Sequence, residues 1–218
     1  LFGATAIGWN GVQLAELARR APAGTAGAVT GASGLVGTDL CAMLDAAGHA
    51  VVPLSIRAGV DAAALHGVDA VVHLAGEPVA GHRWTEAHRE RVLRSRVDGT
   101  TAISRALAAM DPRPRVLISA SAVGWYGDRG EAELDEGAPR GEGFLADVCE
   151  AWEGATAPAR DAGVRVVNLR IGMVLAARGG ALGPMLPAFR AGLGGPMGSG
   201  AQWVPWILVD DLVAAIHH

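Results

Sequence analysis

A glycine-rich turn between a short apolar run and a helical stretch restricts the fold more than any other feature of the sequence. Residues 30–37 read Thr-Gly-Ala-Ser-Gly-Leu-Val-Gly, directly after a β-branched run, and they open a helix expected to reach about Ala47. Gly31 permits a tight turn, Gly34 lets the backbone approach a pyrophosphate, and Gly37 lets the helix pack closely on the strand. The positive helix start favours an anion. A chance glycine-rich turn is the alternative, since the chain has 31 Gly.

The remaining sequence alternates between short apolar runs and Ala-, Leu- and Arg-rich helical stretches. Strands are expected at 28–30, 51–52, 71–74, 116–118 and 164–167. Such alternation is typical of βαβ units with a parallel sheet, and continuous apolar runs indicate a sheet covered on both faces. The predicted fold class is therefore α/β, a doubly wound parallel sheet of the Rossmann type.

Two further segments give weaker expectations. Residues 1–25 are interpreted as a leader, a linker or the end of a preceding domain, and 26–218 as the dinucleotide-binding domain. From about 178 the chain is rich in Gly, Pro and Leu, which indicates a loop-rich lobe over the strand ends. A strand is expected to begin at Gln202. Trp203 and Trp206 are expected in an aromatic core, with the shaping of a pocket as the alternative.

Composition excludes several classes of protein. The formal net charge of −4 offers no basic surface, so nucleic acid is not an expected partner. No apolar run approaches the roughly 18 residues of a membrane span. Cys41 and Cys149 form no CxxC pair, which favours a reducing, cytoplasmic location. All 18 basic residues are Arg, and Tyr126 is the one tyrosine.

The end of the second strand bears on the choice of cofactor. An acid about 20 residues after the glycine turn usually binds the ribose 2′-hydroxyl of NAD. This chain has Ser55 and Arg57 there instead. Because Arg57 can pair with a 2′-phosphate, NADP is favoured over NAD; a solvated Arg at a strand end is the alternative.

Several long stretches resemble the extended short-chain dehydrogenases, and most closely the atypical branch known as the epimerase family. The matching segments are TGASGLVG (30–37), HLAGEPVAGHRWTEAHRERVLRSRVDGT (73–100), VLISASAVGWYGDRGE (116–131), GFLADVCEAWE (143–153) and LGGPMGSGAQWVPWILVDDL (193–212). The resemblance implies a bound NADP and a small C-terminal substrate lobe, of which this chain is expected to hold a part.

The resemblance also implies roles for individual residues. Ser121 matches the active-site hydroxyl that would bond a substrate carbonyl or hydroxyl. Ile171 lies in the segment that would pass under the nicotinamide, where Arg170 is equally well explained as a structural ion-pair partner. The full set of expected cofactor contacts is Gly31, Ser33, Gly34, Leu35, Val36, Ser55, Arg57, Leu74, Ala75, Gly76, Glu77 and Ile171.

The catalytic dyad of active relatives is missing. Their Tyr, which transfers the proton, and the Lys four residues later correspond to Phe144 and Val148, and the chain has no Lys. Tyr126 is the candidate substitute, expected to have no nearby cation and so to be a weak base but a usable hydrogen-bond donor. The alternative for Tyr126 is a side chain that packs against the wall of the pocket. Other candidates are Glu77, His82 and Asp128, while Cys149 is expected to be a buried, inert thiol.

Two hypotheses about function follow from these residues. The first is an NADP-dependent oxidoreductase or epimerase-like enzyme of atypical mechanism, with Ser121 and Tyr126 acting on a small-molecule substrate. The second is a non-catalytic NADP(H)-binding sensor or scaffold. Four arginines between 89 and 96 are expected to form a solvated helix face. A homodimer is a further expectation, because helices that flank sheets of this type often pair two subunits.

Overall fold

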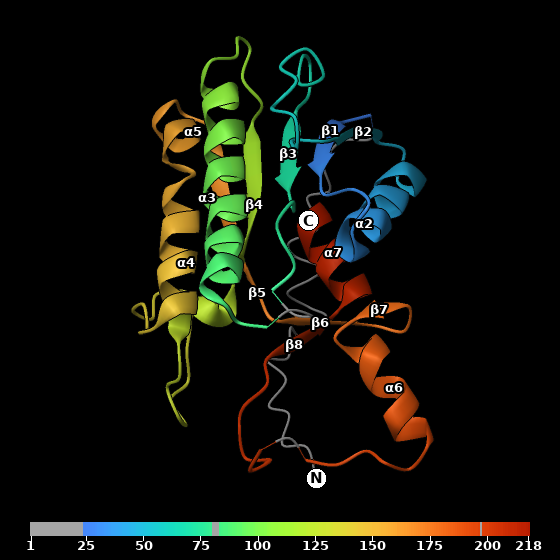
Figure 1. Cartoon of the computed structure of the whole chain (residues 1–218). Coiled ribbons are helices and arrows are strands. Elements are labelled where there is room, and N and C mark those ends of the chain that lie inside the picture. Colours follow the sequence, from blue (N-terminus) through green and yellow to red (C-terminus); the bar gives the residue numbers. More distant parts are fainter. Residues whose placement is uncertain (1–23, 80–82, 197) are drawn as a thin grey trace.

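The computed structural model describes residues 24–79, 83–196 and 198–218 (Figure 1). Most of the expected leader lies outside these residues. The described chain forms two sheets with helices around them, and the larger sheet confirms the predicted fold class.

The larger sheet is parallel throughout. Its strands are β1 (Ala26–Thr30), β2 (Ala50–Leu54), β3 (Ala70–His73), β4 (Val116–Ala122) and β5 (Arg165–Ile171), in the order β2-β1-β3-β4-β5. Each of the five strands expected between residues 28 and 167 is present within a few residues. The chain crosses from the β2 edge to β3 on the other side of β1, which places a topological switch point between β1 and β3. Ligands of open α/β sheets bind outside the carboxyl ends of the strands at such a point.

Helices cover both faces of this sheet (Figure 1). On one face lie α3 (Glu86–Ala108), α4 (Phe144–Gly154) and α5 (Ala157–Asp161); on the other lie α2 (Leu35–Ala46) and α7 (Val209–His217).

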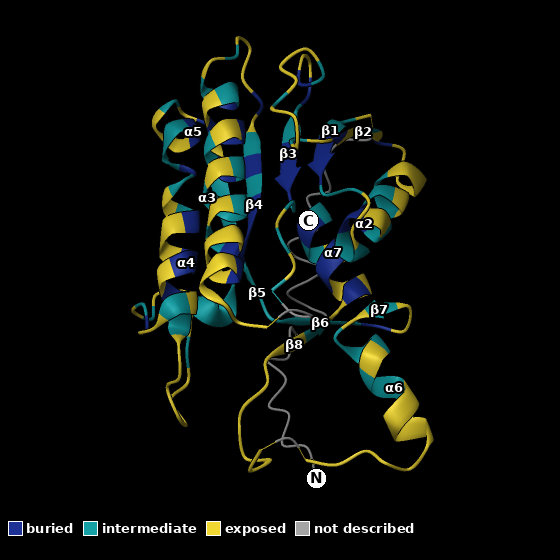
Figure 2. Cartoon of the chain, viewed as in Figure 1, coloured by how far each residue is buried: buried dark blue, intermediate teal, exposed yellow. Residues whose placement is uncertain are grey.

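Neighbouring residues of one strand enter different cores. Ala28 and Val71 pack with Ile103 of α3, whereas Val29 and Val72 belong to the core that includes α2 and α7. Since successive side chains of a strand point to opposite faces, both must be apolar here. Figure 2 accordingly shows the central strands β1, β3 and β4 largely buried between helices whose outer surfaces are exposed.

The small lobe differs from the sequence-based expectation. It contains a second sheet, in the order β7-β6-β8, and a helix: β6 (Met173–Ala176), β7 (Gly179–Gly180), α6 (Leu182–Arg190) and β8 (Trp206–Leu208). The expectation of a loop-rich region was therefore wrong for residues 182–190.

The expected position of the last strand was also wrong, because β8 begins at Trp206 and not at Gln202. Trp203 and Trp206 are 51% and 45% exposed, so neither belongs to an aromatic core. The physical reason at Trp206 is the two-residue period of a strand. Ile207 packs into the core beneath α7, which turns Trp206 and Leu208 outward.

The small lobe lies at the carboxyl ends of the parallel strands, below the arrowheads of β1 and β3 in Figure 1. Gly172 joins β5 to β6, and a Cβ at this position would lie 2.7 Å from the Pro205 carbonyl oxygen. Gly180 of β7 packs against Leu35 at the start of α2, where a Cβ would lie 2.9 Å from the leucine methyl. The lobe is thus held next to the glycine-rich turn.

Candidate functional site

The glycine-rich turn fits closely between the first and third strands. Gly31 has φ +70°, and a Cβ there would lie 2.9 Å from the Ala75 nitrogen and from the Leu74 carbonyl carbon. A Cβ on Gly37 would fall on the Gly31 carbonyl oxygen and 2.8 Å from the Ala32 Cα. Both positions therefore exclude a side chain: Gly31 by its positive φ and by contact, and Gly37 by contact alone.

Helix α2 begins at this turn without a side-chain cap. Its N-cap residue is Gly34 in extended conformation, no capping side chain accepts from the N–H groups of the first turn, and the first turn has no acidic residue. Ser33 and Gly34 are exposed. A helix start of this kind leaves backbone N–H groups and a positive dipole end available to an anion. The residues present thus fit a pyrophosphate.

Two buried polar side chains join the ends of β1 and β3. The Thr30 hydroxyl oxygen accepts from the backbone nitrogens of Leu74 at 3.2 Å and Ala75 at 3.3 Å, and it lies 2.7 Å from Nδ1 of His73. Burial lowers the pKa of His73 to about 4. The arrangement fixes the segment after β3 against Gly31. Sequence reasoning missed both residues, although a Thr and a His ending two apolar strands were a signal.

Ser55 and Arg57 follow the end of β2, and both are exposed. The sheet register pairs Leu54 with Thr30, so Ser55 leaves the sheet next to the glycine-rich turn. Leu35, Val36, Leu74 and Ile171 are partly buried against one apolar core, which also includes Val29 and Val72. The predicted cofactor residues therefore gather at one end of the sheet; their contacts with a cofactor stay a prediction.

The expectation of a solvated arginine face on α3 was wrong for Arg96. Its guanidinium donates to the Glu77 carbonyl oxygen at 3.0 Å and lies 4.9 Å from the Trp152 ring centroid. Burial lowers the pKa of Arg96. Gly76 packs against this side chain, where a Cβ would lie 3.6 Å from the guanidinium carbon. Glu77 itself faces Arg91, with 3.8 Å between carboxylate and guanidinium.

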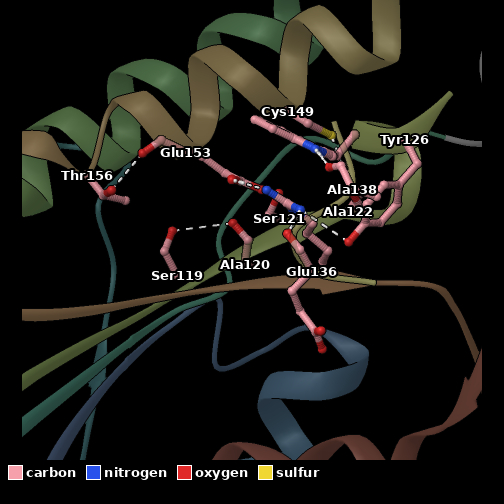
Figure 3. A network of polar contacts seen from close by, with 12 residues as sticks. Ser119, Ala120, Ser121, Ala122, Tyr126, Glu136, Ala138, Cys149, Glu153 and Thr156 are labelled. Carbon is pink, nitrogen blue, oxygen red and sulfur yellow. Dashed lines mark hydrogen bonds and ion pairs between the residues drawn. The ribbon is translucent and has the colours of Figure 1, made fainter. Parts of the chain in front are cut away.

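A polar network connects Ser121 and Tyr126 through two residues that the sequence did not single out as a pair (Figure 3). Ser121, at the end of β4, donates to Glu153 of α4 at 2.7 Å. Arg170 of β5 binds both carboxylate oxygens of Glu153, at 2.9 and 3.1 Å. The same guanidinium donates to the Tyr126 hydroxyl oxygen at 3.1 Å. Tyr126 ends the short 3-10 helix η1 (Val123–Tyr126), which follows β4 directly.

The network corrects one expectation, because Tyr126 does have a cation beside it. Arg170 also stacks on Trp125, with its guanidinium carbon 4.0 Å from the ring centroid. The bonds to Glu153 raise the pKa of Arg170. Arg170 is therefore a charged ion-pair partner, as one interpretation proposed, and at the same time a neighbour of the candidate proton donor.

Phe144 and Val148, which the resemblance aligns with the Tyr and Lys of active relatives, are packing residues in this structure. Phe144 lies edge-to-face with Trp84 at 6.0 Å and under the Arg89 guanidinium at 5.4 Å, and Val148 is buried. Cys149 is buried, as expected, and donates to the Ala122 carbonyl at 3.5 Å; burial raises its pKa.

The other acid–base candidates are placed less favourably. Asp128 accepts from the backbone of Gly130 in an exposed turn, and His82 lies outside the described residues. Among residues 24–79, 83–196 and 198–218, no group of His, Cys, Asp or Glu side chains could hold a metal ion. None of the helices in this part of the chain is both long and apolar enough to cross a membrane.

The fold and the turn define a dinucleotide-binding domain, and comparison with known proteins gives its family. The sequence model of the NAD dependent epimerase/dehydratase family matches residues 28–218. An epimerase family protein of Mycobacterium tuberculosis is 41% identical over 203 residues, which cover 87% of this chain and 67% of that protein. The chain therefore belongs to the NAD dependent epimerase/dehydratase family, as the resemblance predicted.

Two solved structures are similar at comparable identity. The nucleoside-diphosphate sugar epimerase of Corynebacterium glutamicum is 37% identical with a TM-score of 0.81, over 94% of this chain and 45% of that chain. The human epimerase family protein SDR39U1, solved with NADPH, is 36% identical with a TM-score of 0.79, over 87% of this chain and 68% of that one. This chain thus spans less than half of the Corynebacterium protein.

Proposed function

We propose that the chain binds NADP(H) and acts as an oxidoreductase or epimerase-like enzyme on a small-molecule substrate, with an atypical proton donor in place of the Tyr–Lys dyad. The observation that supports it most is the glycine-rich turn. Gly31 and Gly37 exclude any side chain, and an uncapped helix follows them. A bound nicotinamide would supply or accept a hydride; the chain's own part is to hold the substrate at Ser121 and to move a proton.

Three observations favour this cofactor and this substrate class. Arg57 and Ser55 stand where NAD-dependent enzymes have an acid, which favours the 2′-phosphate of NADP. The human relative was solved with NADPH, and the Corynebacterium relative is a nucleoside-diphosphate sugar epimerase. Nucleoside-diphosphate sugars therefore belong in a substrate panel beside simple aldehydes and ketones.

The test is calorimetric titration of the protein with NADPH, NADP, NADH and NAD, followed by single-turnover oxidation of bound NADPH against that panel. We expect selective binding of the phosphorylated pair and hydride consumption with at least one substrate class. Equal binding of NADH would remove the proposed role of Arg57. Absence of binding by all four nucleotides would refute the proposal.

The second candidate function is a non-catalytic NADP(H) sensor or scaffold. The observation that favours it is the packing of Phe144 and Val148 where active relatives have the dyad. The polar network around Ser121 favours the enzyme instead, because a pure binding module has no need for a buried hydroxyl, carboxylate and guanidinium in contact. Tight binding with no turnover across the panel would favour the sensor.

A further inference from the structure

Arg170 places a positive charge against the hydroxyl of the one tyrosine in the chain. Its Nη1 atom donates to Tyr126 Oη at 3.1 Å, and the guanidinium lies 5.2 Å from the tyrosine ring centroid. The Arg170 side chain is 19% exposed, so solvent screens this contact less than it would at the surface. Three bonds hold the guanidinium in place besides the tyrosine: two to Glu153 and one to the Glu136 carbonyl oxygen at 3.1 Å.

The direction of the hydrogen bonds decides which side chain has a proton to give. A guanidinium has donors and no acceptor, so Tyr126 Oη must accept from Arg170. The phenol proton then points away from Arg170. Ser121 has the opposite arrangement, since its own proton is directed to Glu153 and its oxygen is left to accept.

Glu153 is poorly suited to donate. Arg170 binds both of its oxygens and Ser121 donates to one, an arrangement that stabilises the carboxylate. Protonating Glu153 would break the two-bond ion pair. Of the four side chains in the network, Tyr126 is the one whose proton is not committed to another member.

We propose that Tyr126 and Arg170 form the acid–base pair of this site, with Tyr126 as catalytic residue and Arg170 and Glu153 as positioning residues; this rests on the proposed function. In a carbonyl reduction, a bound nicotinamide would supply the hydride that forms the new C–H bond at the carbonyl carbon and would itself be oxidised. The Tyr126 O–H bond breaks, and its proton forms the new O–H bond on the substrate oxygen. The phenolate left behind is stabilised by Arg170 and regains a proton from water. Ser121 accepts from a substrate hydroxyl and orients it.

A structural role for Arg170 is the competing explanation, and it predicts different chemistry for Tyr126. If Arg170 only stabilised the fold, removing it would change unfolding but not the ionisation of the tyrosine. Charged residues near Tyr126 include Arg170 on β5, Glu153 on α4 and Arg129 on the following loop, which donates to the Tyr126 backbone carbonyl at 3.0 Å. Two further acids are close: Glu136, whose carbonyl oxygen accepts from Arg170, and Asp128, two residues after Tyr126. Arg170 and Glu153 carry opposite charges, so neutralising one or the other should shift the ionisation of Tyr126 in opposite directions.

Alkaline titration of the cofactor-free protein, followed by ultraviolet absorbance of the phenolate, reads Tyr126 alone because the chain has one tyrosine. We expect Arg170→Met to move the midpoint to higher pH, because the phenolate loses its cation. Glu153→Gln should move the midpoint to lower pH, because the cation loses its counter-charge. The exposed pair Arg94–Glu90 on α3 supplies the control, and Arg94→Met should leave the midpoint unchanged.

Arg170→Met leaves Glu153 without its cation and can unfold the chain. The double variant Arg170→Met/Glu153→Gln removes both charges, and its midpoint should lie above that of Glu153→Gln alone. Circular dichroism at each pH identifies global unfolding. Midpoints that coincide in all folded variants would overturn the proposal.

Single-turnover rates complete the test. Tyr126→Phe should reduce the rate of hydride consumption by roughly 100-fold or more while NADPH affinity stays within about twofold. A Tyr126→Phe protein that turns over at the wild-type rate would refute the proposal even where cofactor binding is established. Failure of wild-type protein to bind NADPH would refute the proposed function instead, and the titration would still report whether the pair exists.

Discussion

His73 is a titratable side chain held neutral inside a parallel sheet. Both nearby backbone N–H groups, of Leu74 and Ala75, donate to the Thr30 oxygen, so the Thr30 proton is available to His73 Nδ1. The tautomer that fits carries its proton on Nε2, which is buried with no hydrogen-bond partner among the described residues. The ring lies against Gly99 of α3, where a Cβ would be 3.8 Å from Nε2.

This burial predicts a loss of stability in mild acid. Burial lowers the pKa of His73 from 6.5 to about 4, so the unfolded chain takes up a proton before the folded chain does. The stabilisation is complete above the unfolded pKa and is lost as pH falls from 6.5 toward 4. Urea unfolding should show a decrease of about 2 kcal/mol from this residue between about pH 7 and pH 5.

The comparison variant is His73→Asn, which keeps a polar partner for Thr30 and does not titrate in this range. Its free energy of unfolding should be lower than that of the wild type near pH 7, and the pH dependence should be shallower by the same amount of about 2 kcal/mol. Identical pH dependence in both proteins would show that another group is responsible.

At the scale of elements, the junction of β1 and α2 depends on glycines that have no room for a methyl group. Gly37→Ala would place Cβ on the Gly31 carbonyl oxygen, so the helix must shift from the strand. We expect the free energy of unfolding, measured by urea denaturation, to fall by about 3 kcal/mol. The free energy of NADPH binding should fall by more than this, because the turn itself is displaced. Gly154→Ala, in open space at the end of α4, is the matched control and should be neutral or stabilising by about 0.5 kcal/mol. Equal effects of the two substitutions would contradict the close packing at Gly37.

Strands buried on both faces were predictable from sequence, and so was helix α2 after the glycine-rich turn, whereas β8 and α6 were not. β1 and β3 give continuous apolar runs because Ala28 and Val29, like Val71 and Val72, enter opposite cores. β8 has three residues with only Ile207 turned inward, which is too short to give an alternating pattern. Helix α6 contains Pro187, so its composition indicated a loop.

The site was predictable where it is local in sequence. The glycine-rich turn and the Ser121–Tyr126 segment are short motifs, so the sequence alone pointed to both. Arg170 is 44 residues from Tyr126 and 17 from Glu153, and these contacts arise because β4 pairs with β5 under α4. No local pattern encodes such a pairing, which explains why the missing Lys was taken to leave Tyr126 without a cation.

At the scale of the whole molecule, the predicted ligand joins parts that are far apart in sequence. The glycine-rich turn lies at the end of β1, Arg57 follows β2, and the small lobe packs on Leu35 through Gly180. A ligand that contacts all three is bound by the folded chain and not by the unfolded one. Binding must therefore raise the free energy of unfolding by an amount that grows with ligand concentration.

Thermal unfolding measures this linkage directly. NADPH at about 100 times its Kd should stabilise the chain by about 2.7 kcal/mol, which for a chain of this length raises Tm by about 5 to 10 °C. NADH at the same concentration should give a smaller shift, because it lacks the phosphate that Arg57 would bind.

The variant test uses two exposed arginines. Arg57→Ala should reduce the NADPH shift to the NADH value. Arg113 donates to the Ala108 carbonyl oxygen before β4, and Arg113→Ala should leave the NADPH shift unchanged. Arg113 lies before the amino end of β4, at the end of the sheet opposite the glycine-rich turn. The Arg57→Ala and Arg113→Ala proteins therefore each lose one exposed charge, but only Arg57→Ala loses the predicted contact with the cofactor. Equal shifts for NADPH and NADH in the wild type would mean that Arg57 does not select the cofactor.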